Sequence, residues 1–468
     1  MAARPFFVGG TSSNAGKSWM ATAMCAWLHR NGIAVAPFKA QNMSNHSFPC
    51  RGGGEIGRAQ VAQAEACGLE PEPAMNPILL KPNGSGSQVV VNGRVWKTLS
   101  PREYYNHTDA LRVHVRAAYE DLARRFDVIV IEGAGSVTEL NLRGADLVNL
   151  GLVTALKAPW LLVADIERGG VFASIIGTVG LLDPEERALF RGFAVNKFRG
   201  DLSLFDEGVR ILEERTSASC LGVFPFAPDI ALDAEDSLAV RTAPRDPAPP
   251  GARIAIVRLP CLSNATDFSL LKWADWITVP PDADYDFVVL PGTKSTMLDL
   301  RWLRDSGLAD WIVGQHRRGR TVVGVCGGFQ MLGRTIHDPS GAESNQRFAE
   351  GLGLLPAHTV MTAEKTTEVR MARTRGGASF SCYEIHVGMT ELEGTVAPFA
   401  VFDDGGADGA LLPGLVGTYL HGALENPDVC AELFGILPPV VSPKSEQYAR
   451  LADWFERHGR NLSQLGLT

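Results

Sequence analysis

A cysteine and a histidine in the second half of the sequence have the surroundings of a thiol nucleophile and its base. Cys326 lies in TVVGVCGGFQMLG, which predicts a strand, a sharp turn and a helix, with glycine two residues before and two residues after it. Such glycines let the turn strain and expose the sulfur, and the helix N-terminus lowers the thiol pKa. His421 follows the apolar stretch LVGTYL and can take the thiol proton. The pair predicts thiolate attack on a carbonyl carbon, whereas the alternative is an inert buried cysteine.

A second group of residues, near the start of the chain, has the spacing of a phosphate-binding loop. The segment GTSSNAGKS runs from Gly10 to Ser18 between a strand-like FFVGG and a helical KSWMATAMCAWLHR. In this context backbone N–H groups and the helix N-terminus hold phosphates, Lys17 supplies positive charge, and the Ser18 hydroxyl binds magnesium. The alternative is a glycine-rich turn that only permits tight packing. The leading glycine comes one residue early for G-x-x-x-x-G-K-[ST].

Two carboxylates in the first half could complete a magnesium site. Glu132 ends the apolar run DVIVIE, and ligands of open α/β sheets bind at the C-terminal ends of the strands. Glu55 precedes the helical segment RAQVAQA and is either a second ligand or an ordinary acid at a helix start. A solvated strand-end acid is the alternative for Glu132. The residues predicted to bind magnesium are therefore Ser18, Glu132 and Glu55.

The elements that would position these residues form two series. From Phe6 to about Pro225, short Val/Ile/Leu-rich runs alternate with helical stretches, which predicts a parallel sheet covered by helices. Four prolines between Val240 and Arg253 indicate a linker, and a second alternating series follows. We therefore expect two α/β domains. Their predicted bounds are 1–240 for the phosphate-loop domain, 241–252 for the linker, 253–440 for the thiol domain and 441–468 for a C-terminal amphipathic helix.

Composition narrows the possible functions. The 468 residues carry a net charge of -8, with 21% charged and 45% hydrophobic residues, which disfavours both a disordered chain and a general nucleic-acid binder. The eight cysteines are scattered without zinc-ligand spacing, so we expect a reducing compartment and no disulfides. The sequence shows no signal segment and no long apolar run, which predicts a cytoplasmic protein that does not enter a membrane.

The phosphate loop resembles that of the dethiobiotin synthetase-like branch of P-loop proteins, which has the same one-residue expansion. The partition-ATPase branch has a lysine near the front of this loop, where this chain has Thr11, Ser12 and Ser13. Asn196, in FAVNKF, resembles the base-reading asparagine of this branch, although asparagine after a strand is also ordinary turn chemistry. The resemblance implies ATP as the nucleotide. Its predicted contacts are Gly10, Thr11, Asn14, Gly16, Lys17, Ser18 and Asn196.

The order of Cys326 and His421 resembles the class I glutamine amidotransferases, in which a thiolate attacks the side-chain amide of glutamine and releases ammonia. The resemblance implies an oxyanion site made by backbone N–H groups at Gly327 and around Gly292, in LPGTKS. That family has glutamate two residues after the histidine, where this chain has Ala423. The third group is left open between Glu425 and a Cys-His dyad. A secondary candidate pair is His386 and Glu384.

The order of the two halves, together with FKAQNMSNHS, MNPILLKPNG, ADIERGGVFAS, LPGTKST and YEIHVG, resembles the cobyric acid synthase family over nearly the whole chain. The resemblance implies amidation of the b, d, e and g carboxylates of adenosylcobyrinic acid a,c-diamide, a corrinoid, in cobalamin biosynthesis, with ATP, Mg²⁺ and L-glutamine. A polycarboxylate substrate on an acidic protein needs local cations. Candidates are Lys39, Arg58, Lys81, Arg94, Lys97 and Arg168, each of which is otherwise an ordinary surface charge.

Three other functions share part of this pattern. The first is a cobyrinic acid a,c-diamide synthase or another glutamine-dependent amidoligase, with the same half-reactions on a different acceptor. The second is a non-enzymatic P-loop switch protein that senses glutamine, which the presence of both Cys326 and His421 argues against. The third, a partition-type ATPase, is disfavoured by the second half of the chain. The oligomeric state, the order of amidations and the ammonia route do not follow from the sequence.

Overall fold

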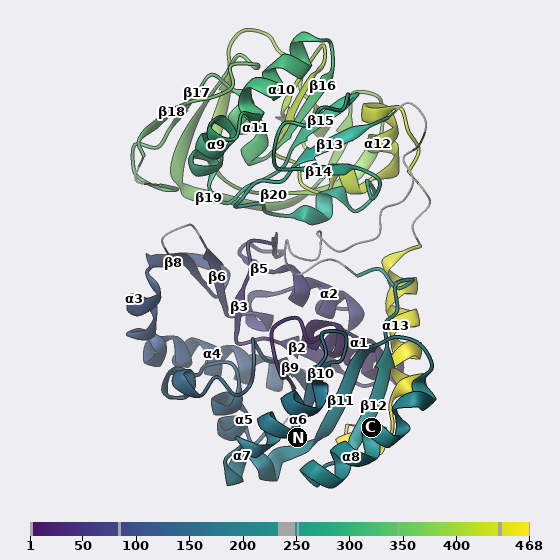
Figure 1. Cartoon of the computed structure of the whole chain (residues 1–468). Coiled ribbons are helices and arrows are strands. Elements are labelled where there is room, and N and C mark those ends of the chain that lie inside the picture. The colour runs from purple at the N-terminus through teal and green to yellow at the C-terminus, as the bar shows by residue number, and fades with distance from the viewer. Residues whose placement is uncertain are drawn as a thin grey trace. The chain divides into compact units, whose positions relative to one another are not determined.

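The computed structural model describes residues 3–82, 86–232, 249, 252–344, 346–438 and 442–467. The chain divides into two compact units (Figure 1). Unit 1 comprises the described residues within Met1–Ser44, Gly54–Asp233 and Ser442–Thr468, and unit 2 those within Asn45–Gly53 and Ala234–Val441. A short segment from the first half of the sequence thus belongs to the second unit, and the C-terminal helix belongs to the first. The predicted linker, 241–252, lies almost entirely outside the described residues.

Unit 1 is built on a parallel sheet of six strands in the order β12-β11-β10-β1-β9-β2. The middle strands are buried along nearly their whole length, as expected for a sheet with helices on both faces. The strands are β1 (Arg4–Gly10), β2 (Val35–Phe38), β9 (Val128–Glu132), β10 (Trp160–Asp165), β11 (Phe190–Phe198) and β12 (Cys220–Pro225).

Helices cover this sheet, and the helix that ends the chain is one of them. Helix α13 (Lys444–His458) packs along α1 (Lys17–Arg30), with Phe455 against Trp27 and Phe224 at ring distances of 5.5 and 5.8 Å (Figure 1). The other helices are α2 (Arg58–Ala66), α3 (Pro101–Tyr105), α4 (Thr108–Ala123), α5 (Leu150–Leu156), α6 (Val171–Gly180), α7 (Pro184–Leu189) and α8 (Asp206–Thr216). A small sheet beside them has the order β3-β6-β7-β8, from β3 (Gln41–Met43), β6 (Ile78–Pro82), β7 (Ser87–Val91) and β8 (Arg94–Leu99).

Unit 2 has a sheet in the order β14-β13-β15-β16-β24-β23, parallel except for the last pair. Its strands are β13 (Ile254–Val257), β14 (Asp275–Ile277), β15 (Phe287–Leu290), β16 (Thr321–Val325), β23 (Ala410–Leu412) and β24 (Leu415–Thr418). Its helices are α9 (Thr296–Asp305), α10 (Leu308–Arg317), α11 (Gly327–Leu332) and α12 (Pro427–Phe434), with the short 3-10 turns η5 (Ala265–Phe268) and η6 (Ala423–Glu425).

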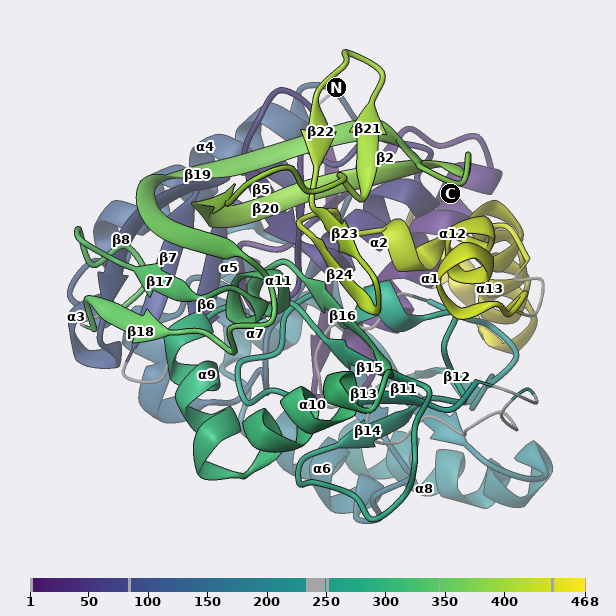
Figure 2. The same ribbon diagram turned by 90° about the horizontal axis from the view of Figure 1, so that it is seen from above.

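A second sheet of unit 2 is dominated by the long antiparallel pair β19 (Ala357–Thr374) and β20 (Ser379–Leu392), which run side by side in Figures 1 and 2. The shorter strands β17 (Thr335–His337), β18 (Phe348–Glu350), β21 (Ala400–Phe402) and β22 (Ala407–Asp408) extend it. Segment Asn45–Gly53 contains the short strand β4 (Ser47–Pro49). The prediction of two α/β domains built on parallel sheets is confirmed. The sequence analysis did not anticipate this second sheet, whose strand pairs are antiparallel except for β17 with β19.

The described part of the chain has no helix that combines the length and the apolar character needed to cross a bilayer. All eight cysteines lie in described segments, and each is a free thiol.

Candidate active sites

The predicted phosphate loop connects β1, which ends at Gly10, to α1, which begins at Lys17. Gly16 has a positive φ of 98°, and a Cβ there would lie 2.0 Å from the Asn196 side-chain nitrogen, so only glycine fits. Asn196 donates from Nδ2 to the carbonyl of Ala15 at 3.1 Å, and Thr11 N bonds to β10. The structure therefore brings the predicted Asn196 against the loop from the end of β11. Reading of the base by Asn196 stays a prediction.

Two lysines bind carbonyl groups of this loop. Lys17 Nζ donates to Ser12 O at 2.9 Å and to Gly135 O at 2.8 Å. Lys197 Nζ donates to Asn14 O at 2.6 Å and to the Asp165 carboxylate at 2.9 Å. The ammonium group of Lys17 thus lies beside the loop at the start of α1, where a phosphate would meet both this charge and the N–H groups of the helix N-terminus. Lys197 was not singled out from the sequence.

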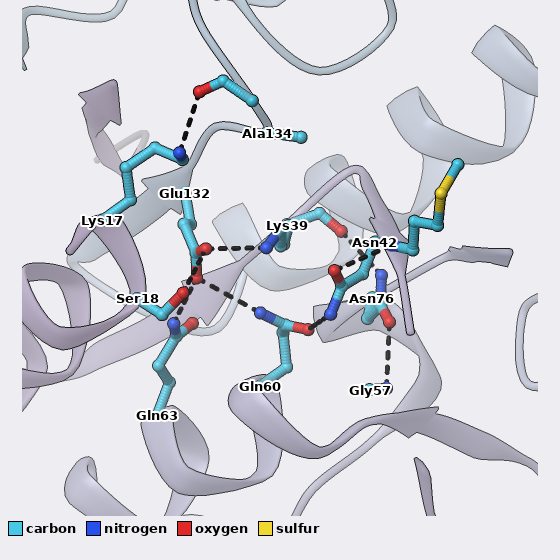
Figure 3. A network of polar contacts seen from close by, with 12 residues as sticks. Lys17, Ser18, Lys39, Asn42, Gly57, Gln60, Gln63, Asn76, Glu132 and Ala134 are labelled. Atoms are coloured by element: carbon cyan, nitrogen blue, oxygen red, sulfur yellow. Dashed lines mark hydrogen bonds and ion pairs between the residues drawn. The ribbon is translucent and has the colours of Figure 1, made fainter. Parts of the chain in front are cut away.

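Glu132 is the centre of a buried polar network at the end of β9 (Figure 3). Its Oε1 accepts from Ser18 Oγ at 2.8 Å and from Lys39 Nζ at 2.7 Å. Its Oε2 accepts from Gln63 Nε2 at 2.5 Å and from Gln60 Nε2 at 3.3 Å. A carboxylate with no exposed surface tolerates its charge only with such partners.

Ser18 and Glu132 carry oxygen atoms of the kind that magnesium prefers as ligands, and the two side chains are hydrogen-bonded to each other in this network. Within the described residues, no group of three or more His, Cys, Asp and Glu side chains could hold a metal ion. A magnesium ion here would therefore take most of its ligands from phosphates and water, which is its usual behaviour. The third predicted ligand, Glu55, is buried in an ion pair with Lys81 at 2.7 Å, so its charge is already balanced.

In unit 2, Cys326 occupies the turn between β16 and α11 with φ 52° and ψ -111°, a conformation that non-glycine residues rarely adopt. Its N–H donates to Thr418 O at 2.7 Å, which fixes the turn to β24. A Cβ on Gly328 would lie 2.1 Å from the carbonyl oxygen of Leu290, so the glycine two residues after the cysteine is required for close packing. The predicted strained turn is therefore present, and Cys326 itself is 5% exposed.

His421 follows β24 and is fully buried beside this turn. Its Nδ1 lies 2.7 Å from Asp267 Oδ2, and Asn264 Nδ2 lies 3.3 Å from its Nε2. Burial by itself would lower the pKa of His421, but attraction to Asp267 and Cys326 and hydrogen bonds with both outweigh it and raise the pKa to about 10. The imidazole is thus placed to hold a proton opposite the thiol.

The two predicted oxyanion residues also lie at this turn. A Cβ on Gly292 would be 3.0 Å from His421 Cε1 and 3.5 Å from Cys326 Cβ. A Cβ on Gly327 would be 3.2 Å from the backbone nitrogen of Thr293. The LPGTKS loop and the first turn of α11 therefore meet at Cys326, and donation of their N–H groups to an oxyanion stays a prediction.

Asp267 is the residue that the sequence analysis missed. It lies on η5, its Oδ1 accepts from the backbone of Gly422 at 2.9 Å, and it is separated from His421 by 154 residues. No local spacing could have marked it. Of the secondary candidates, His386 stacks on Tyr419 at 3.8 Å and faces Glu384 at 3.4 Å, while Glu425 lies on η6.

Comparisons with known proteins also find two domains in this chain. Residues 6–240 match the model of the CobQ/CobB/MinD/ParA nucleotide binding domain, and residues 253–429 match that of the CobB/CobQ-like glutamine amidotransferase domain. Cobyric acid synthase from Dehalococcoides mccartyi (strain CBDB1) is 42% identical, covering 97% of this chain and 94% of its own. That of Rhodococcus jostii is 46% identical over 90% and 84%, and that of Syntrophobacter fumaroxidans 42% over 97% of both. The chain belongs to the cobyric acid synthase family, in which a nucleotide-binding domain and a glutamine amidotransferase domain share one polypeptide.

Proposed function

We propose that this glutamine-dependent amidoligase amidates the b, d, e and g carboxylates of adenosylcobyrinic acid a,c-diamide, using ATP and ammonia released from L-glutamine. The observation that carries the proposal is the strained Cys326 beside the buried His421, in a chain whose other half is a nucleotide-binding domain. Near full-length similarity to cobyric acid synthases supports the choice of acceptor.

In the proposed glutaminase reaction, His421 takes the proton of Cys326 and the thiolate attacks the side-chain amide carbon of glutamine. N–H groups at Gly327 and Gly292 stabilise the negative charge that develops on the amide oxygen. As the intermediate collapses, His421 returns the proton to the leaving nitrogen, ammonia departs and a thioester remains. Water then hydrolyses the thioester to glutamate and regenerates the thiol.

In the proposed synthetase reaction, a carboxylate of the corrinoid attacks the γ-phosphorus of ATP, which yields an acyl phosphate and ADP. Ammonia displaces the phosphate and forms the amide. Lys17 would neutralise charge on the outer phosphates, and Gly16 lets the loop backbone approach them. Ser18 and Glu132 would hold magnesium, which would compensate phosphate charge.

The test incubates the protein with glutamine, Mg-ATP and adenosylcobyrinic acid a,c-diamide and follows the corrinoid by mass spectrometry. We expect four successive mass changes, each equal to the exchange of a hydroxyl for an amino group. Cys326→Ala should still amidate with free ammonia but not with glutamine. Glutaminase and ATPase activity without a corrinoid mass change would refute the acceptor and leave the amidoligase assignment standing.

A further inference from the structure

We infer that Asp267 is the group that orients His421 in the thiol site, in the role that a glutamate two residues after the histidine would otherwise have. This inference rests on the proposed glutaminase function. Asp267 Oδ2 lies 2.7 Å from His421 Nδ1, and Asp267 Oδ1 accepts from the N–H of the next residue, Gly422, at 2.9 Å. Both oxygens of the Asp267 carboxylate thus form hydrogen bonds. They fix the imidazole ring of His421 relative to the backbone of the next residue.

The contact decides which ring nitrogen carries the proton. A carboxylate only accepts hydrogen bonds, so Nδ1 of His421 must be protonated. Nε2 is then the nitrogen that takes the proton of Cys326, and the raised pKa of His421 favours the imidazolium that this transfer forms. Asn264 Nδ2, 3.3 Å from Nε2, agrees with this tautomer because an amide nitrogen donates. The two side chains are 0% and 1% exposed, so water does not weaken their attraction.

The residue found two positions after the histidine supports the same conclusion. Ala423 begins η6, directly after Gly422, whose N–H bonds to Asp267. The carboxylate that contacts His421 comes from η5, so this contact does not need a carboxylate at position 423. Asp267 is therefore a positioning residue that acts through His421.

The experiment compares Asp267→Asn with the wild-type full-length enzyme. Asparagine keeps the size but loses the charge, and we expect kcat for glutamine hydrolysis to fall about 100-fold or more. Amidation with free ammonia should remain near the wild-type rate. Wild-type enzyme without glutaminase activity would refute the proposed function itself, whereas an active wild type with an equally active Asp267→Asn would overturn only this inference.

A pH profile separates positioning from a structural role. Loss of Asp267 removes a partner of the imidazolium, so alkylation of Cys326 by iodoacetamide should begin at higher pH in Asp267→Asn than in wild type. Asp267→Glu should recover part of the activity. The matched control is Asp338→Asn, which changes an equally buried carboxylate that accepts from the backbone of residues 342–344. Its alkylation profile should match wild type, and an equal shift in both variants would overturn the inference.

We infer secondly, from a separate set of contacts, that segment Asn45–Gly53 positions His421, the base of the same site. His46 Nδ1 accepts from Ala265 N at 3.2 Å, and Ser47 N donates to Asn264 Oδ1 at 3.2 Å. Asn264 in turn faces His421 Nε2. The segment comes from the first half of the sequence, yet it belongs to unit 2. This inference also rests on the proposed glutaminase function.

A second set of contacts from the same segment reaches the ring of His421 through Tyr383. The Phe48 ring packs against Tyr383 at 4.7 Å, and Tyr383 stacks on His421 at 5.1 Å with an angle of 19° between the rings. Tyr383 and His421 also exchange two backbone hydrogen bonds of 3.0 Å. The segment thus touches two residues that each contact His421, and it restricts where the imidazole can lie.

The test changes one contact at a time in the full-length protein. In His46→Ala the N–H of Ala265 loses its acceptor, and we expect kcat for glutamine hydrolysis to fall about tenfold, with a smaller change in KM. His46→Asn should restore activity because its Oδ1 replaces the acceptor Nδ1. Phe48→Ala should lower kcat in the same way.

Met43→Ala is the control, since Met43 lies in the same stretch but is 59% exposed and belongs to unit 1. It should leave glutamine hydrolysis unchanged. Amidation with free ammonia serves as the internal reference for every variant. Wild-type glutaminase kinetics in both His46→Ala and Phe48→Ala, or no recovery in His46→Asn, would overturn the inference. An inactive wild type would instead point to failure of the proposed function.

Discussion

Lys39 Nζ and Glu132 Oε1 are 2.7 Å apart, with only 4% and 0% of the two side chains exposed. The same carboxylate oxygen also accepts from Ser18, so a lysine and a predicted magnesium ligand converge on one atom (Figure 3). Lys39 therefore balances the charge of Glu132 in this structure. A cation that binds Glu132 through Oε1 would have to share this oxygen with the ammonium group.

Replacing Lys39 should destabilise the folded protein. Lys39→Met leaves a buried carboxylate without its counter-charge, and we expect the free energy of unfolding to fall by about 3 to 5 kcal/mol. Urea denaturation followed by circular dichroism measures the change. Arg210→Met, which breaks an exposed ion pair with Glu207, is the control and should have no measurable effect. Equal stabilities of the two variants would contradict the structural role assigned to Lys39.

Gly16→Ala should disable the nucleotide site. The new methyl group would overlap the Asn196 side chain, and a positive φ is unfavourable for alanine. We expect ATP affinity to fall by about tenfold or more, measured by calorimetry. Gly177→Ala, in the middle of α6 with no atom within 4 Å of the added carbon, is the matched control and should bind ATP normally. Normal binding by Gly16→Ala would show that the loop accommodates a side chain.

Stability should fall in alkaline solution because of His421. Its pKa is raised in the folded state to about 10 from its ordinary value of 6.5, so the folded protein binds this proton more tightly than the unfolded chain does. This stabilisation is complete below pH 6.5 and is lost as the pH rises to about 10. The unfolding free energy of wild type minus that of His421→Gln should therefore decrease across this window. A difference that stays constant with pH would contradict the contact with Asp267.

The C-terminal helix should stabilise unit 1 and not unit 2. Phe455 is 1% exposed and packs on Trp27 and Phe224, so Phe455→Ala should lower the unfolding free energy of unit 1 by about 3 to 5 kcal/mol. Thermal unfolding with and without ATP measures this loss. Glutaminase activity at low temperature should be unchanged. Val113→Ala, at a position 67% exposed on α4, is the control with little expected effect.

Local constraints explain which parts of the thiol site could be predicted from the sequence. The strained turn at Cys326 needs glycine within two residues, because the start of the helix packs onto the carbonyl of Leu290. The required glycine is therefore close to the cysteine in the sequence. The phosphate loop is marked in the same way by Gly16 beside Lys17. Alternating apolar runs likewise predicted both parallel sheets.

Contacts between distant segments could not be predicted in this way. Asp267 and His421 are 154 residues apart, and only the fold of unit 2 brings η5 beside the end of β24. His46 and Ala265, which share a hydrogen bond, are 219 residues apart in the sequence. The ion pair of Glu55 with Lys81, which competes with a metal role for Glu55, also depends on a buried approach that no spacing reveals.

Packing of α13 on α1 has a consequence for how the protein is made. The ribosome releases α1 early and α13 only after all of unit 2. The apolar side chains around Trp27 therefore lack α13 as a packing partner while more than half of the chain is synthesised. Unit 2 has all of its described elements before α13 emerges. During translation, the amidotransferase unit can therefore reach its final packing while the nucleotide unit still exposes an incomplete core.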